Sequence, residues 1–219
     1  MMNVKRIKPE ETKEWFLYKH YAKRIPNIVY AFGLFDGQEL VGVCSFGIPA
    51  SPSLIVGSIG PEYADNFLEL NRLCVNDGLP KNSLSHFVGE CLRMLPKPMV
   101  VVSYADSGMN HCGYIYQATN FVYTGLTKPH VEYELPNEPG KHSRHALDEY
   151  GGINEAKKKG VNFIVKERTL KHRYFYFCGS KTQRRKMVAS LKYPIMPYPK
   201  EENKRYDSSY SVHANLELF

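Results

Sequence analysis

The sequence predicts an α/β domain of the α+β kind, with a mixed central sheet flanked by helices and a basic C-terminal extension. Residues 67–126 show strand, loop, helix, strand, helix and strand patterns in succession, which is typical of a compact α/β unit. Within that unit, apolar residues between 84 and 95 recur at helical spacing. The stretch 99–104 is nearly all apolar, as expected for a strand buried on both faces.

The part of the chain before residue 67 predicts one helix and one hairpin. Residues 10–24 have the pattern of a helix that a following proline ends. The runs 27–35 and 39–47 are rich in aromatic and β-branched residues, and the Asp-Gly dipeptide between them suits a tight antiparallel turn. The Pro-, Ser- and Gly-rich stretch 48–66 is predicted to be a loop.

The compact unit begins with an unusual strand. Strict alternation over 67–75 places Arg72 on the same face as Leu68, Leu70 and Cys74. The elements predicted after it are a loop at 76–83, a helix to residue 95, a strand ending at Asp106, a short helix near 110–119 and a strand at 121–126.

The chain changes character beyond residue 126. The predicted elements are a helix at 144–159 interrupted by two glycines, strands at 162–167 and 173–178, and a basic helix at 181–191. We therefore divide the chain into a catalytic core (1–126), a basic α/β extension (127–200) and a C-terminal tail (201–219).

The net charge of +7 is unevenly distributed. Residues 1–126 contain 11 basic and 11 acidic residues, whereas residues 127–219 contain 18 and 11. The stretch 166–192 alone holds nine basic residues and one acidic residue. A concentrated basic face predicts a polyanionic partner, and the alternative is a solvated basic surface that keeps the protein soluble.

The cysteines and the hydropathy indicate a cytoplasmic protein. Five cysteines at wide spacing contain no Cys-x-x-Cys pair, which argues against a disulfide framework and a zinc ribbon. The polar first residues do not resemble a secretory signal, and no apolar run is long enough to predict a membrane-spanning helix.

Two charged residues are candidates for catalysis. Asp106 ends a buried strand, where ligands meet parallel sheets, and its carboxylate could accept a proton; the alternative is a helix cap. Arg72 interrupts an apolar face and needs an anionic partner, which we expect to be Asp106 or a phosphate of a group donor. A structural ion pair is the alternative for Arg72.

The loop before the 84–95 helix is a candidate phosphate site, because a helix N-terminus presents unpaired N–H groups to anions. Its candidate donor-binding residues are Gly78, Lys81, Asn82 and Ser83. His111 and Cys112, with His20, are candidates for a metal such as iron, but their spacing matches no strong ligand pattern, and core packing is the alternative.

The basic extension holds the candidate DNA-binding residues. Cations suit phosphates and exposed aromatic rings stack on bases, although two of the four aromatics at 174–177 should face the core. The candidates are Lys171, Arg173, Tyr174, Arg184, Arg185 and Lys186, with a second cluster at His142, Arg144 and His145.

The order of elements in 67–126 resembles the acyl-transferring core of the GNAT superfamily. The stretch 114–125 is similar to the final motif of that superfamily, which implies that Tyr116 donates a proton to the leaving group; core packing is the alternative for Tyr116. The Gln/Arg-x-x-Gly-x-Gly/Ala phosphate loop is absent, and Gly78 is what remains of it. The resemblance implies a donor of the acyl-coenzyme A type.

A second resemblance, to the phage DNA-modification family called Mom, covers most of residues 20–200. It is carried by several short runs, which are His20-Tyr21, 31–43, 69–73, 80–82, Ser103-Tyr104-Ala105-Asp106, 113–125, 171–174 and 197–200. It implies transfer of a carbamoylmethyl- or acyl-type group to the N6 amino group of adenine in double-stranded DNA, in the host cytoplasm, which protects phage DNA from restriction. It adds His20, Tyr21 and Tyr104 to the candidate site. The alternatives are a general N-acyltransferase and a non-catalytic DNA-binding protein.

Overall fold

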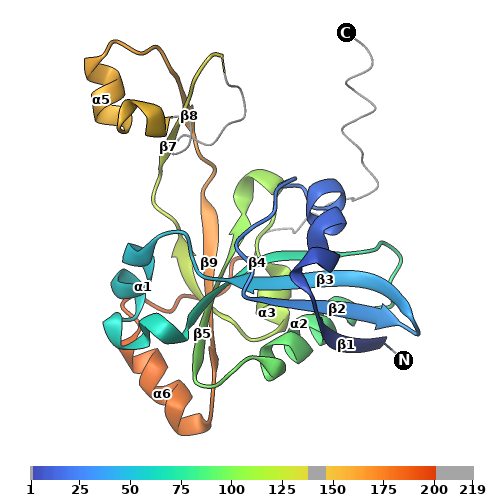
Figure 1. The fold of residues 1–219 in the computed structure, drawn as a ribbon. Coiled ribbons are helices and arrows are strands. Elements are labelled where there is room, and N and C mark those ends of the chain that lie inside the picture. The colour runs from blue at the N-terminus through green and yellow to red at the C-terminus, as the bar shows by residue number, and fades with distance from the viewer. Residues whose placement is uncertain (1, 138–146, 201–219) are drawn as a thin grey trace.

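A computed structural model describes residues 2–137 and 147–200, and a seven-stranded sheet forms its centre (Figure 1). The strand order is β1-β2-β3-β4-β5-β9-β6, in which β4 and β5 run parallel and the other described pairs are antiparallel. The strands are β1 (Met2–Ile7), β2 (Tyr30–Asp36), β3 (Glu39–Gly47), β4 (Phe67–Val75), β5 (Met99–Asp106), β6 (Val122–Leu126) and β9 (Lys171–Cys178). This mixed sheet flanked by helices confirms the predicted fold class.

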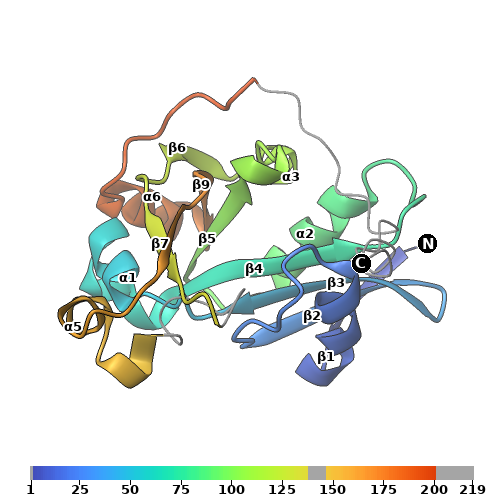
Figure 2. The ribbon, with the colours of Figure 1, turned by 90° about the horizontal axis from the view of Figure 1, so that it is seen from above.

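Helices cover both faces of the sheet (Figure 2). On one face, α2 and α3 pack on a core that includes Phe87, Leu92 and Tyr116. On the other face, α1 and α6 pack on a core that includes Ile55, Phe175 and Met187. The helices are α1 (Pro52–Ser58), α2 (Ser83–Met94), α3 (Tyr114–Ala118), α5 (Ile153–Lys158) and α6 (Lys181–Ser190). None of the helices in the described ranges has the length and apolar content needed to cross a bilayer.

Several predicted elements are confirmed. The β2–β3 hairpin is antiparallel, and Gly37 in its turn has a φ of +60°, a conformation that glycine adopts without strain. Helix α2 carries the predicted apolar stripe into the core. Residues Val100–Val102 of β5 are fully buried, as expected for a strand covered on both faces.

The N-terminal region differs from the prediction. The expected helix at 10–24 is shorter: residues 9–19 are helical, as a 3₁₀ turn, η1 (Pro9–Thr12), two α-helical residues and a π-helical turn, η2 (Trp15–Lys19), and the helix ends where His20 is extended. The expected loop at 48–66 contains α1 and a 3₁₀ segment, η3 (Pro61–Asn66). Edge strand β1 was not predicted, because its charged residues obscure the alternation.

Strand β9 lies between β5 and β6, although it belongs to the basic extension. It pairs with β5 along its whole length, from Met99 opposite Cys178 to Asp106 opposite Lys171. A strand of the basic extension therefore completes the sheet of the predicted catalytic core (1–126). Strand β5 is apolar on both faces and needs a second neighbour, which the later part of the chain supplies.

A small unit from the extension stands apart from the sheet (Figure 1). It consists of β7 (Val131–Glu134) paired antiparallel with β8 (Ile164–Glu167), a 3₁₀ turn, η5 (Asp148–Tyr150), and α5. Leu135, Leu147 and Ala156 form its own buried cluster. The candidate residues His142, Arg144 and His145, and the tail 201–219, lie outside the described residues.

The burial of α2 can be tested by truncating one of its core residues. Phe87 is fully buried, so Phe87→Ala is expected to lower the free energy of unfolding by about 3–5 kcal/mol. Met94 on the same helix is 42% exposed, and Met94→Ala is expected to change it by less than about 0.5 kcal/mol. Urea denaturation followed by circular dichroism measures both values, and equal losses would contradict this packing.

Candidate active site

The parallel pair β4–β5 separates soon after it begins. The two strands pair only from Phe67 opposite Val100 to Glu69 opposite Val102, although β4 continues to Val75 and β5 to Asp106. At the point of separation, the hydroxyl of Ser103 donates to the carbonyl oxygen of Leu70 at 2.8 Å. Beyond this fork, the side of β4 that faces β5 lines a cavity.

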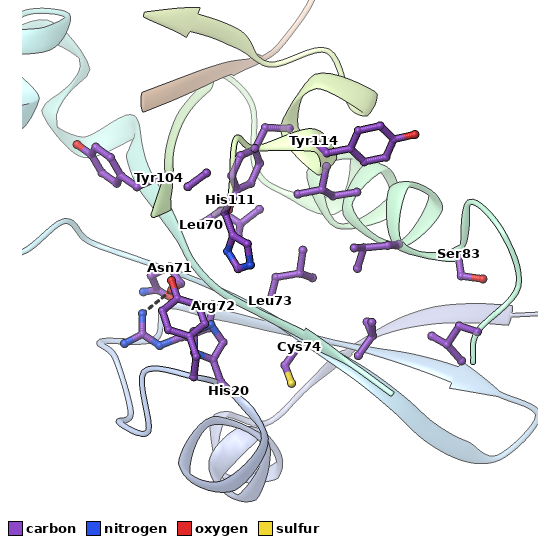
Figure 3. A pocket seen from close by; sticks show the side chains of 18 of the residues that line it. His20, Leu70, Asn71, Arg72, Leu73, Cys74, Ser83, Tyr104, His111 and Tyr114 are labelled. Carbon is purple, nitrogen blue, oxygen red and sulfur yellow. Dashed lines mark hydrogen bonds between the residues drawn. The ribbon is translucent and has the colours of Figure 1, made fainter. Parts of the chain in front are cut away.

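The cavity has a volume of about 510 Å³ (Figure 3). Its walls come from β4, the segment after η2, the loop before α2, the end of β5, the segment leading into α3, and Lys171 of β9. The volume falls in the range of about 300–1,000 Å³ that small-molecule sites occupy. The fork therefore creates a site of suitable size in the middle of the fold.

A β-bulge in β4 turns Arg72 towards this cavity. In the pairing with β3, Ser45 lies opposite Arg72 and Phe46 lies opposite Leu70, so Asn71 is the extra residue. Because Ser45 and Phe46 are successive residues, Arg72 and Leu70 point to opposite faces. The prediction that Arg72 shares a face with Leu68 and Leu70 is therefore wrong, since strict alternation ends at the bulge.

Arg72 is half-buried beside the cavity, and its expected ion pair with Asp106 is not formed. Its Nη1 donates to the backbone oxygen of Asn71 at 2.6 Å. Its Nε is buried and has no hydrogen-bond partner among the described residues. Burial lowers the pKa of Arg72, the positive charge of Arg24 lowers it further, and Tyr21 and Glu69 act in the opposite direction.

His20 and Tyr21 follow η2 and form an aromatic edge of the cavity. The two rings stack with centroids 4.4 Å apart, and Tyr21 in turn contacts the edge of His111 at 5.9 Å. The Nδ1 atom of His20 accepts a hydrogen bond from the Ala22 N–H at 3.0 Å, so a neutral ring carries its proton on Nε2. Burial, and then the positive charge of Arg72, lower the pKa of His20 to about 3.

Asp106 is the N-cap of a 3₁₀ turn, η4 (Ser107–Met109), which is the alternative that the sequence left open. Its Oδ1 accepts from the Gly108 N–H at 3.0 Å and from the Thr169 hydroxyl at 2.6 Å. Its Oδ2 lies 3.8 Å from the Nζ of Lys171, which lines the cavity. Asp106 thus holds Lys171 beside the cavity and acts electrostatically on Tyr21 and His111.

Glu69 is the candidate residue that the sequence analysis missed. It is the last β4 residue paired with β5, and it lines the cavity at the fork. Burial raises the pKa of its carboxyl group, and the positive charges of Arg72, Lys171 and Arg24 act against that rise. An acidic residue flanked by Leu68 and Leu70 and three positions before Arg72 was the signal that could have identified it.

Two of the predicted tyrosines line the same cavity. Tyr116 of α3 is buried, and burial raises the pKa of its hydroxyl, while its hydrogen bond with Ser103 opposes that rise. Tyr104 near the end of β5 is half-buried, and burial and the nearby Glu69 raise its pKa. Both hydroxyl groups therefore remain protonated at neutral pH and can donate hydrogen bonds.

The loop before α2 forms the far end of the cavity from Arg72 and His20 (Figure 3). Lys81, Asn82 and Ser83 line it, whereas Gly78 is not among the lining residues and has open space around its Cα. Among the described residues, no group of three or more His, Cys, Asp or Glu side chains is placed to hold a metal ion. His20 and His111 contact Tyr21 instead, and Cys112 is buried.

The candidate DNA-binding residues fall in different surroundings. Tyr174 is fully buried, and its hydroxyl donates to the Cys112 carbonyl, so the expectation that it stacks on a base is wrong. Arg173 donates from Nε and Nη2 to Thr124 at 3.0 Å each and lies over the Tyr193 ring, which makes it a packing residue. Arg184, Arg185 and Lys186 are exposed on α6.

Comparison with known proteins gives a match to one protein family and alignments to solved acetyltransferase structures. The model of the Mom protein family matches residues 1–200. The methylcarbamoylase mom of Escherichia phage Mu is 30% identical over 191 residues, which cover 83% of this chain and 77% of that protein.

Solved acetyltransferase structures align at low identity. An N-acetyltransferase from Staphylococcus aureus is 10% identical with a TM-score of 0.46, covering 81% of this chain and 99% of that one. A putative acetyltransferase from Salmonella typhimurium, solved with acetyl-CoA, is 10% identical with a TM-score of 0.47, covering 82% and 95%.

The depressed pKa of His20 predicts a pH-dependent stability. Its pKa is about 3 in the folded state and about 6.5 when unfolded, so the unfolded chain binds the extra proton first as pH falls. The free energy of unfolding is expected to fall by about 2 kcal/mol between pH 7 and pH 5 because of this group alone.

His20→Gln removes this contribution, so its pH dependence of unfolding should be flatter than that of the wild type. His86→Gln is the matched control, because His86 is exposed on α2, and it should leave the pH dependence as in the wild type. Urea titrations at pH 7 and pH 5 measure both, and identical pH profiles for His20→Gln and the wild type would contradict the neutral buried ring.

Proposed function

The chain belongs to the Mom protein family and is a transferase, and we propose that it adds a small carbamoylmethyl- or acyl-type group to the N6 amino group of adenine in double-stranded DNA. Such a modification would protect phage DNA from host restriction. The observation that carries this proposal is the cavity at the β4–β5 fork, where a carboxyl group with a raised pKa lies among cations and protonated tyrosines.

The residues at the fork suit the proton movements of such a transfer. When the N6 nitrogen forms its new C–N bond it must lose a proton, and a carboxylate with a raised pKa is the stronger base. Glu69 lines the cavity, whereas both oxygens of Asp106 face partners of its own chain, so we assign proton acceptance to Glu69 and positioning of Lys171 to Asp106. Tyr116 can return a proton to the leaving group, because burial keeps its hydroxyl protonated.

The far end of the cavity suits the donor. Lys81 supplies a positive charge beside the first turn of α2, and a helix N-terminus favours negative charge, so this end fits the phosphates of a coenzyme A-type molecule. Attack of the N6 amine on the carbonyl carbon of an acyl-coenzyme A breaks the C–S bond, releases the coenzyme A thiol and leaves an acyl group on N6, whereas a carbamoylmethyl group requires a donor whose leaving group is on the methylene carbon. Asn82 and Ser83 add polar side chains at the same place.

The target base must leave the duplex to reach this cavity, because N6 is paired inside the helix. Cations along the way favour the DNA strand, and Lys19, Arg72 and Lys171 line the cavity away from the donor end. The exposed cluster on α6 follows the Cys178 end of β9, whereas the Lys171 end lines the cavity, so this cluster would contact the duplex at a distance from the cavity. A general N-acyltransferase would not need the cations that bind DNA. A non-catalytic DNA-binding protein would not need the cavity that receives the extruded base.

Nucleoside mass spectrometry of DNA from cells that express the protein tests the proposed reaction. The wild type is expected to give a mass-shifted deoxyadenosine, and Glu69→Gln is expected to reduce it at least a hundredfold, because general-base catalysis contributes about 10²–10⁴-fold. Glu90→Gln is the matched control, since Glu90 lies on α2 and pairs with Arg93. Unmodified deoxyadenosine together with tight DNA binding would favour the non-catalytic DNA-binding protein. Unmodified deoxyadenosine without DNA binding would favour the general N-acyltransferase.

The α6 cluster gives a separate prediction on DNA affinity. Replacing Arg184, Arg185 and Lys186 together by glutamine should weaken binding and reduce the slope of log K against log salt by up to about 2.7, at about 0.9 per phosphate contact. Fluorescence anisotropy with a labelled duplex over a series of NaCl concentrations measures this slope. A slope equal to that of the wild type would remove α6 from the DNA interface.

A further inference from the structure

Arg72 has a hydrogen-bond donor that the described part of the chain does not satisfy. Its Nε is buried, and no described atom accepts from it, while Nη1 is used by the Asn71 carbonyl. Buried polar groups in folded proteins almost always have a partner, so this unpaired N–H indicates that the guanidinium beside the cavity lacks a further acceptor, which a ligand would supply. A guanidinium presents its donors as a planar fork, which matches the oxygens of a phosphate.

Positive charge converges on this end of the cavity. Arg24 lowers the pKa of Arg72, and Arg72 together with Lys23 lowers that of His20. Because the Nδ1 atom of neutral His20 accepts from Ala22, its Nε2–H can donate a further hydrogen bond to an anion. Glu69 raises the pKa of Arg72, but it does so by less than burial or the charge of Arg24 lowers it. The local excess of cations therefore favours an anion.

We propose that Arg72, with Arg24 at the surface, binds a phosphodiester group of the DNA strand beside the extruded adenosine, and that Asn71 positions Arg72 for this contact. Ser83 and the α2 N-terminus lie at the opposite end of the cavity (Figure 3), so the donor phosphates have their own place. Arg24 is exposed, which places it where DNA would approach. An extruded nucleotide remains joined to its two neighbouring phosphates, so one of these phosphates would lie at the edge of the cavity beside Arg72 and Arg24.

Asn71 is a positioning residue because its side chain holds the β-bulge. Its Oδ1 accepts from the Ser45 hydroxyl at 2.7 Å, and its Nδ2 donates to the Asn27 carbonyl at 2.8 Å. Gly47 makes this approach possible, since a Cβ there would lie 2.0 Å from the Asn27 oxygen. Without the extra residue, Arg72 would share the face of Leu70, which packs in the apolar core below α2.

The inference rests on the proposed function only in taking DNA as the substrate, so its test measures binding and not modification. The probe is a labelled 20-base-pair duplex with one A·C mismatch, which makes extrusion of the adenine easier. Its Kd is measured by fluorescence anisotropy over a series of NaCl concentrations, and coenzyme A binding is measured in parallel by calorimetry. Thermal unfolding of each variant checks that it is folded.

Arg72→Ala is expected to weaken DNA binding at least tenfold and to reduce the salt slope by about 0.9, which is the loss of one phosphate contact. Arg72→Lys keeps the charge and should retain most of the slope. Asn71→Ala keeps Arg72 itself, so a reduced slope in this variant reports misplacement of the guanidinium. Arg93→Ala removes an equal charge from the C-terminal end of α2 and should leave both quantities unchanged.

Four outcomes would overturn the inference. They are an unchanged slope in Arg72→Ala with weaker coenzyme A binding, an equal loss in Arg93→Ala, a wild-type slope in Asn71→Ala, and no DNA binding by the wild type. If the wild type modifies no adenine but the expected slopes are found, the proposed reaction fails and the phosphate contact stands.

Discussion

The early separation of β4 from β5 is the constraint on which the site depends. The pair shares three residue pairs, and Ser103 then satisfies the Leu70 carbonyl at the fork. Strand β5 stays in the sheet because β9 pairs with its other edge. The opening leaves the side of β4 exposed to a cavity and brings Tyr116, which is hydrogen-bonded to Ser103, to its inner wall. The separation of the two strands therefore produces the cavity and places Tyr116 in its wall.

The β-bulge at Asn71 is a second constraint that acts on the same strand. A one-residue insertion reverses the faces of every side chain beyond it, so Arg72 leaves the apolar core and meets His20 and Tyr21. Because the insertion lies just beyond Glu69, one short stretch of β4 delivers both a carboxyl group and a guanidinium to the cavity. The fork supplies the space, and the bulge supplies the charge within it.

Hydrophobic periodicity predicted the elements that have a strong apolar pattern. It could not predict which strands pair with one another in the sheet. Helix α2 and strand β5 could be predicted because each has a regular apolar pattern. The position of β9 inside the sheet could not, because alternation does not identify a neighbouring strand. The bulge reversed the predicted face of Arg72. Alternation over 174–177 gave two possible faces, and the structure buries Tyr174. Glu69 was missed because polar residues are expected in half-buried strands.

The two groups of cations in this protein have different physical roles. Arg184, Arg185 and Lys186 belong to the basic extension and are exposed, so water and salt screen them, and they suit a grip on DNA that does not depend on sequence. Arg72 belongs to the half of the chain with no net charge, and it is half-buried in the wall of a cavity where charges interact more strongly than in water. In the proposed function, the surplus of +7 would attract DNA, whereas recognition in the cavity would depend on a few cations that the net charge of their own half does not reveal.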